Sequence, residues 1–239
     1  MAGIAANSER GSTGAVMMTL RAVIAVFLKD VRSEIKTRYA LNAVLMFVLT
    51  AVAVIAFSSA GEKITNGIAA SMLWIVLFFS AMTGLQKSFV SEEERGTSLM
   101  LSLHAPSVAI YFGKLLFNMA LTMLLYGLAT IAFFVFITDV EIRSPLLFWV
   151  SFVLGSLATA SATTIIAAII AKANTKAALF PVLSFPVLLP LILSGVETTY
   201  QALSGVAFAE ARNNFQIISA YMVVVIAVSF MLFDFVWKD

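Results

Sequence analysis

Six long apolar runs dominate this sequence and limit the folds that are open to it. Each run is about 20 residues long, which is the length of helix that crosses a hydrocarbon layer roughly 30 Å thick. The runs are continuous and do not alternate with polar residues, so helices fit them better than the strands of a membrane barrel. The expected spans are 41–58, 67–85, 115–137, 146–171, 178–196 and 216–236.

The composition supports the same fold class. Of the 239 residues, 61% are hydrophobic and only 12% are charged, whereas a soluble domain carries about 25% charged residues. We therefore expect an all-α, polytopic membrane protein with a single domain over 17–239. Residues 1–16, which are rich in Gly, Ser and Ala, are predicted to form a disordered tail. The absence of cysteine excludes disulfides and thiolate metal sites.

Lysine and arginine are distributed unevenly between the two ends of the predicted spans. Twelve of the 15 lie before the first span, in the second and fourth connections or at the C-terminus, and three lie in the other connections. Cytoplasmic loops carry the excess of positive charge in membrane proteins. This distribution places both termini and the 87–114 connection in the cytoplasm, which requires an even number of spans.

The segment 18–38 has apolar residues at helical spacing and cations at the positions between them. Phe27 belongs to the apolar stripe, and Arg32 and Lys36 belong to the charged side. This pattern predicts an amphipathic helix in the cytoplasmic membrane interface, with its cations near lipid phosphates. The alternative is an ordinary positively charged flank of the first span.

The most polar segment, 87–106, lies between the second and third spans. Its three consecutive carboxylates, Glu92, Glu93 and Glu94, cannot lie in lipid and are expected to face water. Ser91 and Glu94 have the spacing of a capping box, and acidic residues at the start of a helix interact favourably with its dipole. The segment is therefore predicted to begin a short helix with these carboxylates in its first turn.

A second short helix is predicted in the same connection. Gly96 predicts a break, and Thr97 can cap the helix that follows. Leu99 and Leu101 give that helix an apolar face, and Pro106 ends it. A short helix of this kind at the membrane surface suits a groove on a cytosolic partner. The alternative is an ordinary solvated loop.

The fourth span has a face of small and hydroxyl residues. Ser151, Gly155, Thr159 and Thr163 recur every four residues along it. Small residues let helix backbones approach closely, and hydroxyl groups can hydrogen-bond across the contact. We therefore predict close helix packing at this face, with a path for a polar substrate as the alternative.

The fifth span is rich in proline, and a polar segment follows it. Pro181, Pro186 and Pro190 each remove a backbone donor, so a kinked helix is expected, either static or able to move. Glu197, near the outer end, is expected to cap the next segment or to face water. Residues 197–215 are too polar for a span and are predicted to form a re-entrant or surface hairpin on the outer side.

Three stretches carry a resemblance to a known family: SFVSEEERGT at 88–97, Pro106 with YFGKL at 111–115, and FPVLLPLILSGVETT at 185–199. The layout is similar to that of type 2 ABC exporter permeases, whose first cytoplasmic loop reads E-x-E-x-G-T followed by leucines and proline. The matching residues here are Glu92, Glu94, Gly96, Thr97, Leu99, Leu101 and Pro106. Within that class the chain resembles most closely the haem exporter protein B (CcmB) family of cytochrome c maturation, from about residue 20 to 237.

The resemblance implies a non-catalytic permease subunit of a bacterial inner membrane that works with a separate ATP-binding subunit of the CcmA type. It also implies a homodimer within a complex that includes CcmC- and CcmD-type subunits. That complex would use ATP to deliver haem across the membrane or to release the haem-loaded chaperone of the CcmE type. Haem would be cargo and ATP would bind the partner, so this chain is expected to hold no cofactor and no metal itself.

The same resemblance implies roles for particular residues. The 87–114 connection would be a coupling loop, with its acids and Arg95 paired to charges on the ATPase and its leucines in an apolar groove. The interface would comprise Glu92, Glu93, Glu94, Arg95, Gly96, Thr97, Leu99 and Leu101. The proline-rich fifth span would be a moving element or lie at the dimer seam, with the residues Pro181, Pro186, Pro190 and Glu197.

Two other classes of function stay open from the residues alone. A stand-alone secondary transporter or channel could divide the six spans into inverted repeats of three, but the halves show no convincing similarity. A membrane enzyme would need a catalytic constellation, and the sequence has no HExxH, GxSxG or P-loop motif. The basic stripe before the first span is poor support for nucleic-acid binding, and none is expected.

Overall fold

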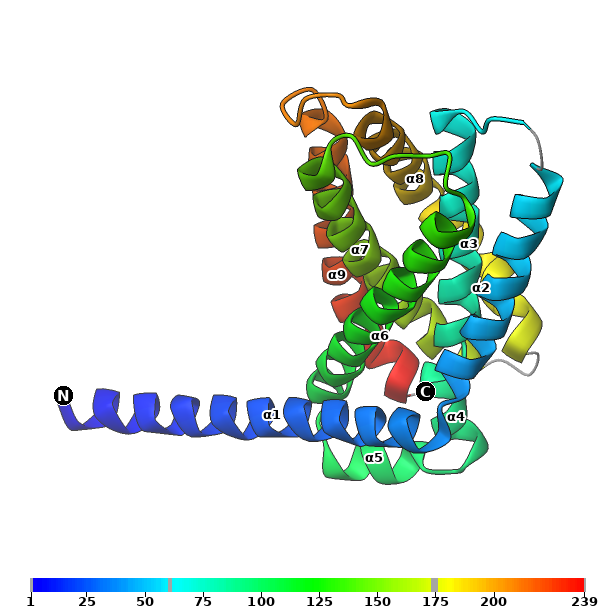
Figure 1. The fold of residues 1–239 in the computed structure, drawn as a ribbon. Coiled ribbons are helices and arrows are strands. Elements are labelled where there is room, and N and C mark those ends of the chain that lie inside the picture. Colours follow the sequence, from blue (N-terminus) through cyan, green and yellow to red (C-terminus); the bar gives the residue numbers. More distant parts are fainter. Residues whose placement is uncertain (1, 60–61, 173–175, 239) are drawn as a thin grey trace.

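The computed structural model describes residues 2–59, 62–172 and 176–238, and these contain helices and connections but no strand (Figure 1). This confirms the all-α class. The helices are α1 Ala2–Thr37, α2 Tyr39–Ser58, α3 Asn66–Leu85, α4 Lys87–Glu94, α5 Ser98–His104, α6 Ser107–Phe136, α7 Pro145–Ala171, α8 Lys176–Ser204 and α9 Arg212–Lys238.

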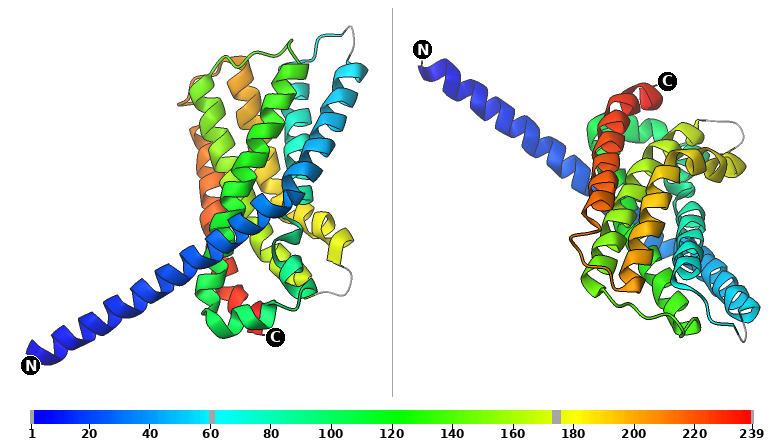
Figure 2. Two further views of the ribbon diagram at one scale, coloured as in Figure 1. Left: turned by 60° about the horizontal axis from the view of Figure 1, so that its bottom comes forward. Right: turned by 90° about the horizontal axis from the view of Figure 1, so that it is seen from above.

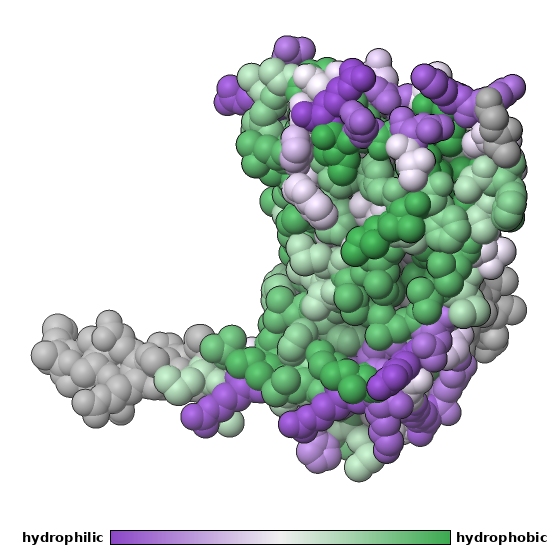
Figure 3. Space-filling model, in the orientation of Figure 1, coloured by the Kyte–Doolittle hydropathy of each residue, from purple (hydrophilic) through white to green (hydrophobic). Residues whose placement is uncertain are grey.

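Six segments of the described chain are long and apolar enough to cross a membrane, as predicted. They correspond to α2, α3 with its continuation into α4, α6, α7, α8 and α9. The third span begins earlier than expected, at Ser107, because Pro106 precedes a helix that continues without a break into the apolar run. Figure 3 shows the apolar surface of these helices as a band between two hydrophilic ends.

Helix α7 lies inside the bundle, while α9 lies at its periphery (Figure 2). In the most apolar window of α7, 78% of the residues are buried within the protein, against 17% in α9. The buried residues of α7 are mostly Ala, Ser, Thr and Gly, which let neighbouring helices approach its backbone. The outer helices instead present large apolar side chains to their surroundings.

The small-residue face of α7 is a packing surface, as predicted. Ser151, Thr159 and Thr163 are at most 2% exposed. The Ser151 hydroxyl lies 2.6 Å from Thr198 Oγ1 on α8, and the Tyr126 hydroxyl on α6 lies 3.0 Å from Thr159 Oγ1. These contacts join α7 to the helices on either side of it.

A tryptophan of α3 occupies the space beside two glycines. The indole Nε1 of Trp74 donates a hydrogen bond to Thr199 Oγ1 at 2.9 Å. A Cβ atom on Gly195 of α8 would lie 2.0 Å from Trp74 Cζ2, and one on Gly155 of α7 would lie 2.8 Å from Trp74 Cη2. The packing of α3 against α7 and α8 therefore depends on the absence of side chains at these two positions.

Helix α8 is continuous although it contains three prolines. The hydroxyl of Tyr221 on α9 donates to the carbonyl oxygen of Val187 at 2.9 Å. Val187 lies three residues before Pro190, in the turn that a proline loosens. The bond gives this carbonyl a partner on α9 and so ties the proline-rich helix to its neighbour.

The outer-side hairpin predicted over 197–215 is not present. Helix α8 continues to Ser204, and a short connection beginning at Gly205, with φ of +83°, leads to α9 at Arg212. Thr198 and Thr199 remain helical because their hydroxyl groups hydrogen-bond inside the bundle, to Ser151 of α7 and to Trp74 of α3.

Helix α1 lies across one end of the bundle, and both termini, α4 and α5 are at the same end (Figure 1). Arg38, with φ of +50°, turns the chain from α1 into α2. Residues 2–16 are helical, which differs from the disordered tail predicted over 1–16. No proline interrupts these residues, and a helix that has already formed extends at little cost per residue.

We expect Gly195→Ala to lower the free energy of unfolding by about 1–3 kcal/mol, because the added methyl group overlaps the Trp74 ring. Gly127→Ala is the matched control, since nothing lies within 4 Å of a Cβ atom at that helical position. Thermal unfolding of the purified variants in detergent measures the difference. Equal unfolding temperatures for the two variants would contradict the packing described.

Candidate functional site

Helices α4 and α5 form a short helical pair at the end of the bundle that holds both termini (Figure 1). The turn between them is a Schellman motif: Thr97 N donates to Glu92 O at 2.9 Å, and Gly96 N donates to Glu93 O at 3.1 Å. Gly96 has φ of +66°, a conformation that side chains disfavour. The break predicted at this glycine is confirmed, as are the two short helices around it.

The capping box predicted for this segment is wrong. Ser91 lies inside α4, which begins at Lys87, and Glu94 is the last residue of the helix. The three carboxylates therefore occupy the last turn of α4 and not its first, and the helix dipole disfavours them there. Cations from other helices offset this effect for one of the three.

That carboxylate, Glu92, is buried and belongs to a cluster of four charged side chains, which we call the ion cluster. Glu92 is paired with Lys29 of α1, and its Oε1 lies 3.2 Å from Lys114 Nζ of α6. Lys114 Nζ lies 3.0 Å from Asp30 Oδ2 of α1, and Lys29 Nζ lies 3.3 Å from Asp30 Oδ1. The two positive and two negative charges compensate one another, which burial of ions requires.

Backbone and hydroxyl groups complete the ion cluster. Lys114 Nζ donates to the carbonyl oxygen of Ser88 at 2.6 Å, and Thr97 Oγ1 donates to Glu92 Oε2 at 2.7 Å. Thr97 therefore serves the cluster and does not cap α5 with its side chain. Lys114 is 1% exposed, and the two ammonium groups favour the ionised form of Glu92. Helices α1, α4 and α6 are thus joined at one point.

A chain of side-chain hydrogen bonds continues from α4 into the bundle. Ser88 Oγ donates to Asn118 Oδ1 of α6 at 2.9 Å, and Asn118 Nδ2 donates to Thr164 Oγ1 of α7 at 2.9 Å. Asn118 and Thr164 are completely buried. The short helix α4 is therefore connected to α7, the most buried span.

Helix α5 has an apolar face that no other described segment of the chain covers. Leu99, Met100 and Leu103 are 69%, 62% and 75% exposed. Leu101, which was predicted to share this face, is half-buried and packs against the core. A group of exposed apolar side chains at a mostly hydrophilic end of a protein is typical of a protein-binding surface (Figure 3).

A groove of about 660 Å³ lies beside this face, between α5 and the ends of α7 and α9. Its lining includes Glu93, Leu99, Lys172 and Trp237. The Trp237 ring stacks on Phe233, with centroids 5.7 Å apart, and packs 5.8 Å from Phe89 of α4. The last turns of α9 thereby support α4 from within the protein.

The other residues predicted for the site lie at or near the surface. Those that are exposed are Glu94, Arg95, Arg32, Lys36, Pro186, Pro190 and Glu197. Those that are half-buried are Glu93, Phe27 and Pro181. Glu197 accepts a hydrogen bond from Gln201 Nε2 at 3.0 Å, within α8. The structure does not bring the proline-rich helix and the α4–α5 pair together into one site.

Reasoning from the sequence missed three members of the ion cluster. Asp30 follows the buried Val23 and Val26 at helical spacing, so an acid on the packed side of an amphipathic helix was the available signal. Lys114 stands beside an apolar run and looks like the end of a loop, but α6 begins two turns earlier. Lys29, next to Asp30, gave no signal of its own.

The comparison with known families matches nearly the whole chain. A model of the CcmB protein family matches residues 21–234. The chain belongs to the CcmB family. A CcmB protein is an ABC-type permease subunit that acts in cytochrome c maturation and haem export, and it associates with ABC transporter partners such as CcmA. With its six spans, this CcmB chain is a multi-pass membrane protein. No curated protein matches the sequence.

The range shared with the CcmB family includes the ion cluster, both short helices and nearly all of the six spans. The family assignment therefore covers the candidate site as well as the membrane bundle. The site combines an exposed apolar face on α5 with polar contacts that connect α4 to α1, α6 and α7.

We expect Lys114→Met to lower the free energy of unfolding by about 3 kcal/mol, because Asp30 and Glu92 lose the buried cation that they share. Lys63→Met, in the exposed α2–α3 connection at the opposite end, is the control (Figure 1). Thermal unfolding in detergent compares the two. Adding Glu92→Gln to Lys114→Met should restore part of the loss. Equal unfolding temperatures for the two single variants would refute the structural role of the cluster.

We expect Gly96→Val to cost about 1–2 kcal/mol and to reduce cytochrome c maturation, because a branched side chain is strained at a φ of +66°. Gly96→Asn is the control, since asparagine tolerates this conformation. Unfolding temperature and the yield of mature cytochrome c are measured for both. If valine and asparagine behave alike, the turn does not depend on the backbone of Gly96.

Proposed function

We propose that the α4–α5 pair is the surface on which a CcmA-type ATP-binding subunit docks and through which it moves this CcmB permease. The exposed apolar face of α5 carries this proposal. Leu99, Met100 and Leu103 would be buried in a groove of the partner, which favours association. The half-buried Glu93, which lines the groove beside this face, would pair with a cation of the ATPase.

The sidedness of the chain supports this partner. The excess of lysine and arginine at the α4–α5 end supports a cytoplasmic position for that end, where ATP is available. Both termini would then be cytoplasmic, since they lie at the same end (Figure 1). Helix α1 would lie in the membrane interface beside the docking surface, with Arg32 and Lys36 near lipid phosphates.

The ion cluster would transmit motion from α5 to the membrane helices. Glu92 lies on α4, while its partners Lys29 and Lys114 lie on α1 and α6, so a displacement of α4 acts on both helices. The hydrogen bonds through Asn118 extend this connection to α7. Glu92 would thus act inside the permease, and not on the ATPase as its position in the sequence suggested.

Membership of the CcmB family supports a wider assembly. We propose a homodimer with two ATP-binding subunits and with CcmC- and CcmD-type partners in a bacterial inner membrane. It would use ATP to deliver haem or to release the haem-loaded CcmE-type chaperone, with haem as cargo and no cofactor resident in this chain. Helices α8 and α9 present apolar faces that either lipid or a second permease subunit would cover. Pro186 and Pro190 lie on such a face and would be near the dimer seam.

We expect Leu99→Asp combined with Leu103→Asp to weaken binding of the CcmA-type subunit by at least about 30-fold and to abolish cytochrome c maturation. Membrane insertion should be unchanged, because both side chains are exposed in the permease itself. A pull-down of the tagged protein in mild detergent measures the association.

The matched control for this test is Leu99→Met with Leu103→Met, which keeps the face apolar and should retain both association and maturation. Co-purification of the ATP-binding subunit with the aspartate variant at the wild-type level would show that α5 is not the docking surface.

A further inference from the structure

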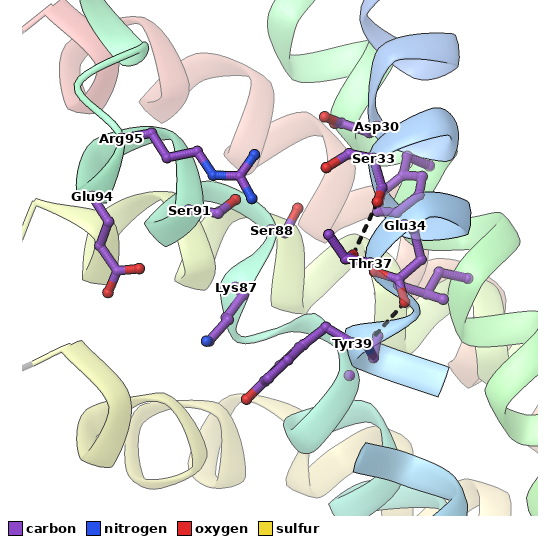
Figure 4. A pocket seen from close by; sticks show the side chains of 14 residues that line it. Asp30, Ser33, Glu34, Thr37, Tyr39, Lys87, Ser88, Ser91, Glu94 and Arg95 are labelled. Carbon is purple, nitrogen blue, oxygen red and sulfur yellow. Dashed lines mark hydrogen bonds between the residues drawn. The ribbon is translucent and has the colours of Figure 1, made fainter. Parts of the chain in front are cut away.

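A second polar site lies beside the ion cluster, in a cavity of about 280 Å³ between α1, α2, α4 and α6 (Figure 4). The cavity is separate from the exposed face of α5, so its argument does not depend on the proposed docking of an ATPase. Its walls carry side chains of both charge signs and several hydroxyl groups. Part of its lining is apolar.

The first wall of the cavity, formed by α4 and the residue after it, carries two cations, Lys87 and Arg95, and one carboxylate, Glu94, which points away from them (Figure 4). The Arg95 guanidinium extends from α4 over the cavity (Figure 4), and Lys87 Nζ lies 4.0 Å from the centroid of the Tyr39 ring. The ion pairs found among the described residues all lie in the ion cluster, so neither cation is neutralised by a carboxylate there. The Arg95 guanidinium beside the hydroxyl of Ser91 (Figure 4), with Lys87 as a second cation on this wall, forms a suitable site for a phosphate group.

The opposite wall, on α1, is acidic. Glu34 Oε1 accepts the backbone N–H of Ala40 at 2.9 Å and so helps to fix the start of α2. The second carboxylate oxygen, Oε2, has no hydrogen-bond partner within the described part of the chain and faces the cavity with Ser33 (Figure 4). Asp30 also lines this wall, but Lys29 and Lys114 compensate its charge. Glu34 therefore remains as an acceptor for an ammonium group.

The cavity lies at the level expected for lipid headgroups. Helix α1 runs along the boundary between the apolar band and the hydrophilic end of the molecule (Figure 3). Phe117 and Leu121 of α6, which belong to a membrane span, supply apolar lining. A ligand that fits this arrangement carries a phosphate, an ammonium group and an apolar chain.

We propose that this cavity binds the headgroup of a zwitterionic aminophospholipid, of the class of phosphatidylethanolamine. Lys87, Arg95 and Ser91 bind its phosphate, and Glu34 accepts hydrogen bonds from its ammonium group. The acyl chains follow Phe117 and Leu121 toward the membrane interior. The bound lipid bridges α4 and the corner between α1 and α2.

Native mass spectrometry of the purified full-length protein tests this site after incubation with vesicles of phosphatidylethanolamine, phosphatidylcholine or phosphatidylglycerol, or with inorganic phosphate. We expect the wild type to retain phosphatidylethanolamine about tenfold more than the other two lipids, because only its headgroup combines a phosphate with ammonium donors. Lys87→Gln with Arg95→Gln should remove this preference and lower retention of phosphatidylethanolamine about tenfold.

Glu34→Gln tests the contact with the ammonium group independently of the contact with the phosphate. The substitution keeps an oxygen that can accept the Ala40 N–H, so the corner is preserved while the charge is removed. Retention of phosphatidylethanolamine should fall to that of phosphatidylglycerol, and phosphatidylglycerol retention should not decrease. The matched control is Arg32→Gln with Lys36→Gln, which removes two exposed cations of α1 that do not line the cavity and should keep the wild-type ranking.

Equal retention of the three lipids by the wild type would overturn the proposal, and so would a loss of preference in the Arg32 and Lys36 control as large as in the cavity variant. Binding of inorganic phosphate with no lipid retained would identify a site for free phosphate instead, and would also overturn it. If Lys87→Gln with Arg95→Gln does not fold, the lipid preference of the wild type and of Glu34→Gln still tests the proposal.

Discussion

Four charged side chains, Lys29, Asp30, Glu92 and Lys114, hold three helices together at one end of this CcmB permease. None of these helices could bury its own charge alone, because removing an ion from water costs several kcal/mol unless a partner compensates it. Burial is possible only when α1, α4 and α6 meet in one geometry. The cluster therefore sets the position of α1 and of the α4–α5 pair relative to the membrane bundle.

The features that could be predicted from the sequence are those set by local composition. The length of an apolar run determines a span, and the turn at Gly96 follows from a residue that tolerates positive φ. The hairpin over 197–215 was not formed because its hydroxyl residues hydrogen-bond inside the bundle, as Thr198 does with Ser151. Polarity counted along the chain cannot distinguish such a buried contact from exposure to water.

The site was harder to predict because its members come from three distant segments. Glu92 was expected to face water with its two neighbours, yet it is buried since Lys29 and Lys114 meet it there. The three consecutive acids predicted the start of a helix, but they lie at the end of α4, which follows α3 closely and ends at Glu94. On α5 the apolar character was predictable, but only packing decides that Leu101 faces inward while its neighbours stay exposed.

The central claim is that the ion cluster makes α1, α4, α5 and α6 move as one unit. The chain has no cysteine, so spin labels can be attached to cysteines introduced at Arg32 of α1 and His104 of α5, both exposed. Double electron–electron resonance on the complex with its ATP-binding subunit measures the distance between them, without nucleotide and with bound ATP. We expect the same narrow distribution in both states, and a broader one with Lys114→Met. A shift of the wild-type distance on binding ATP, or a distribution that Lys114→Met leaves unchanged, would contradict the account.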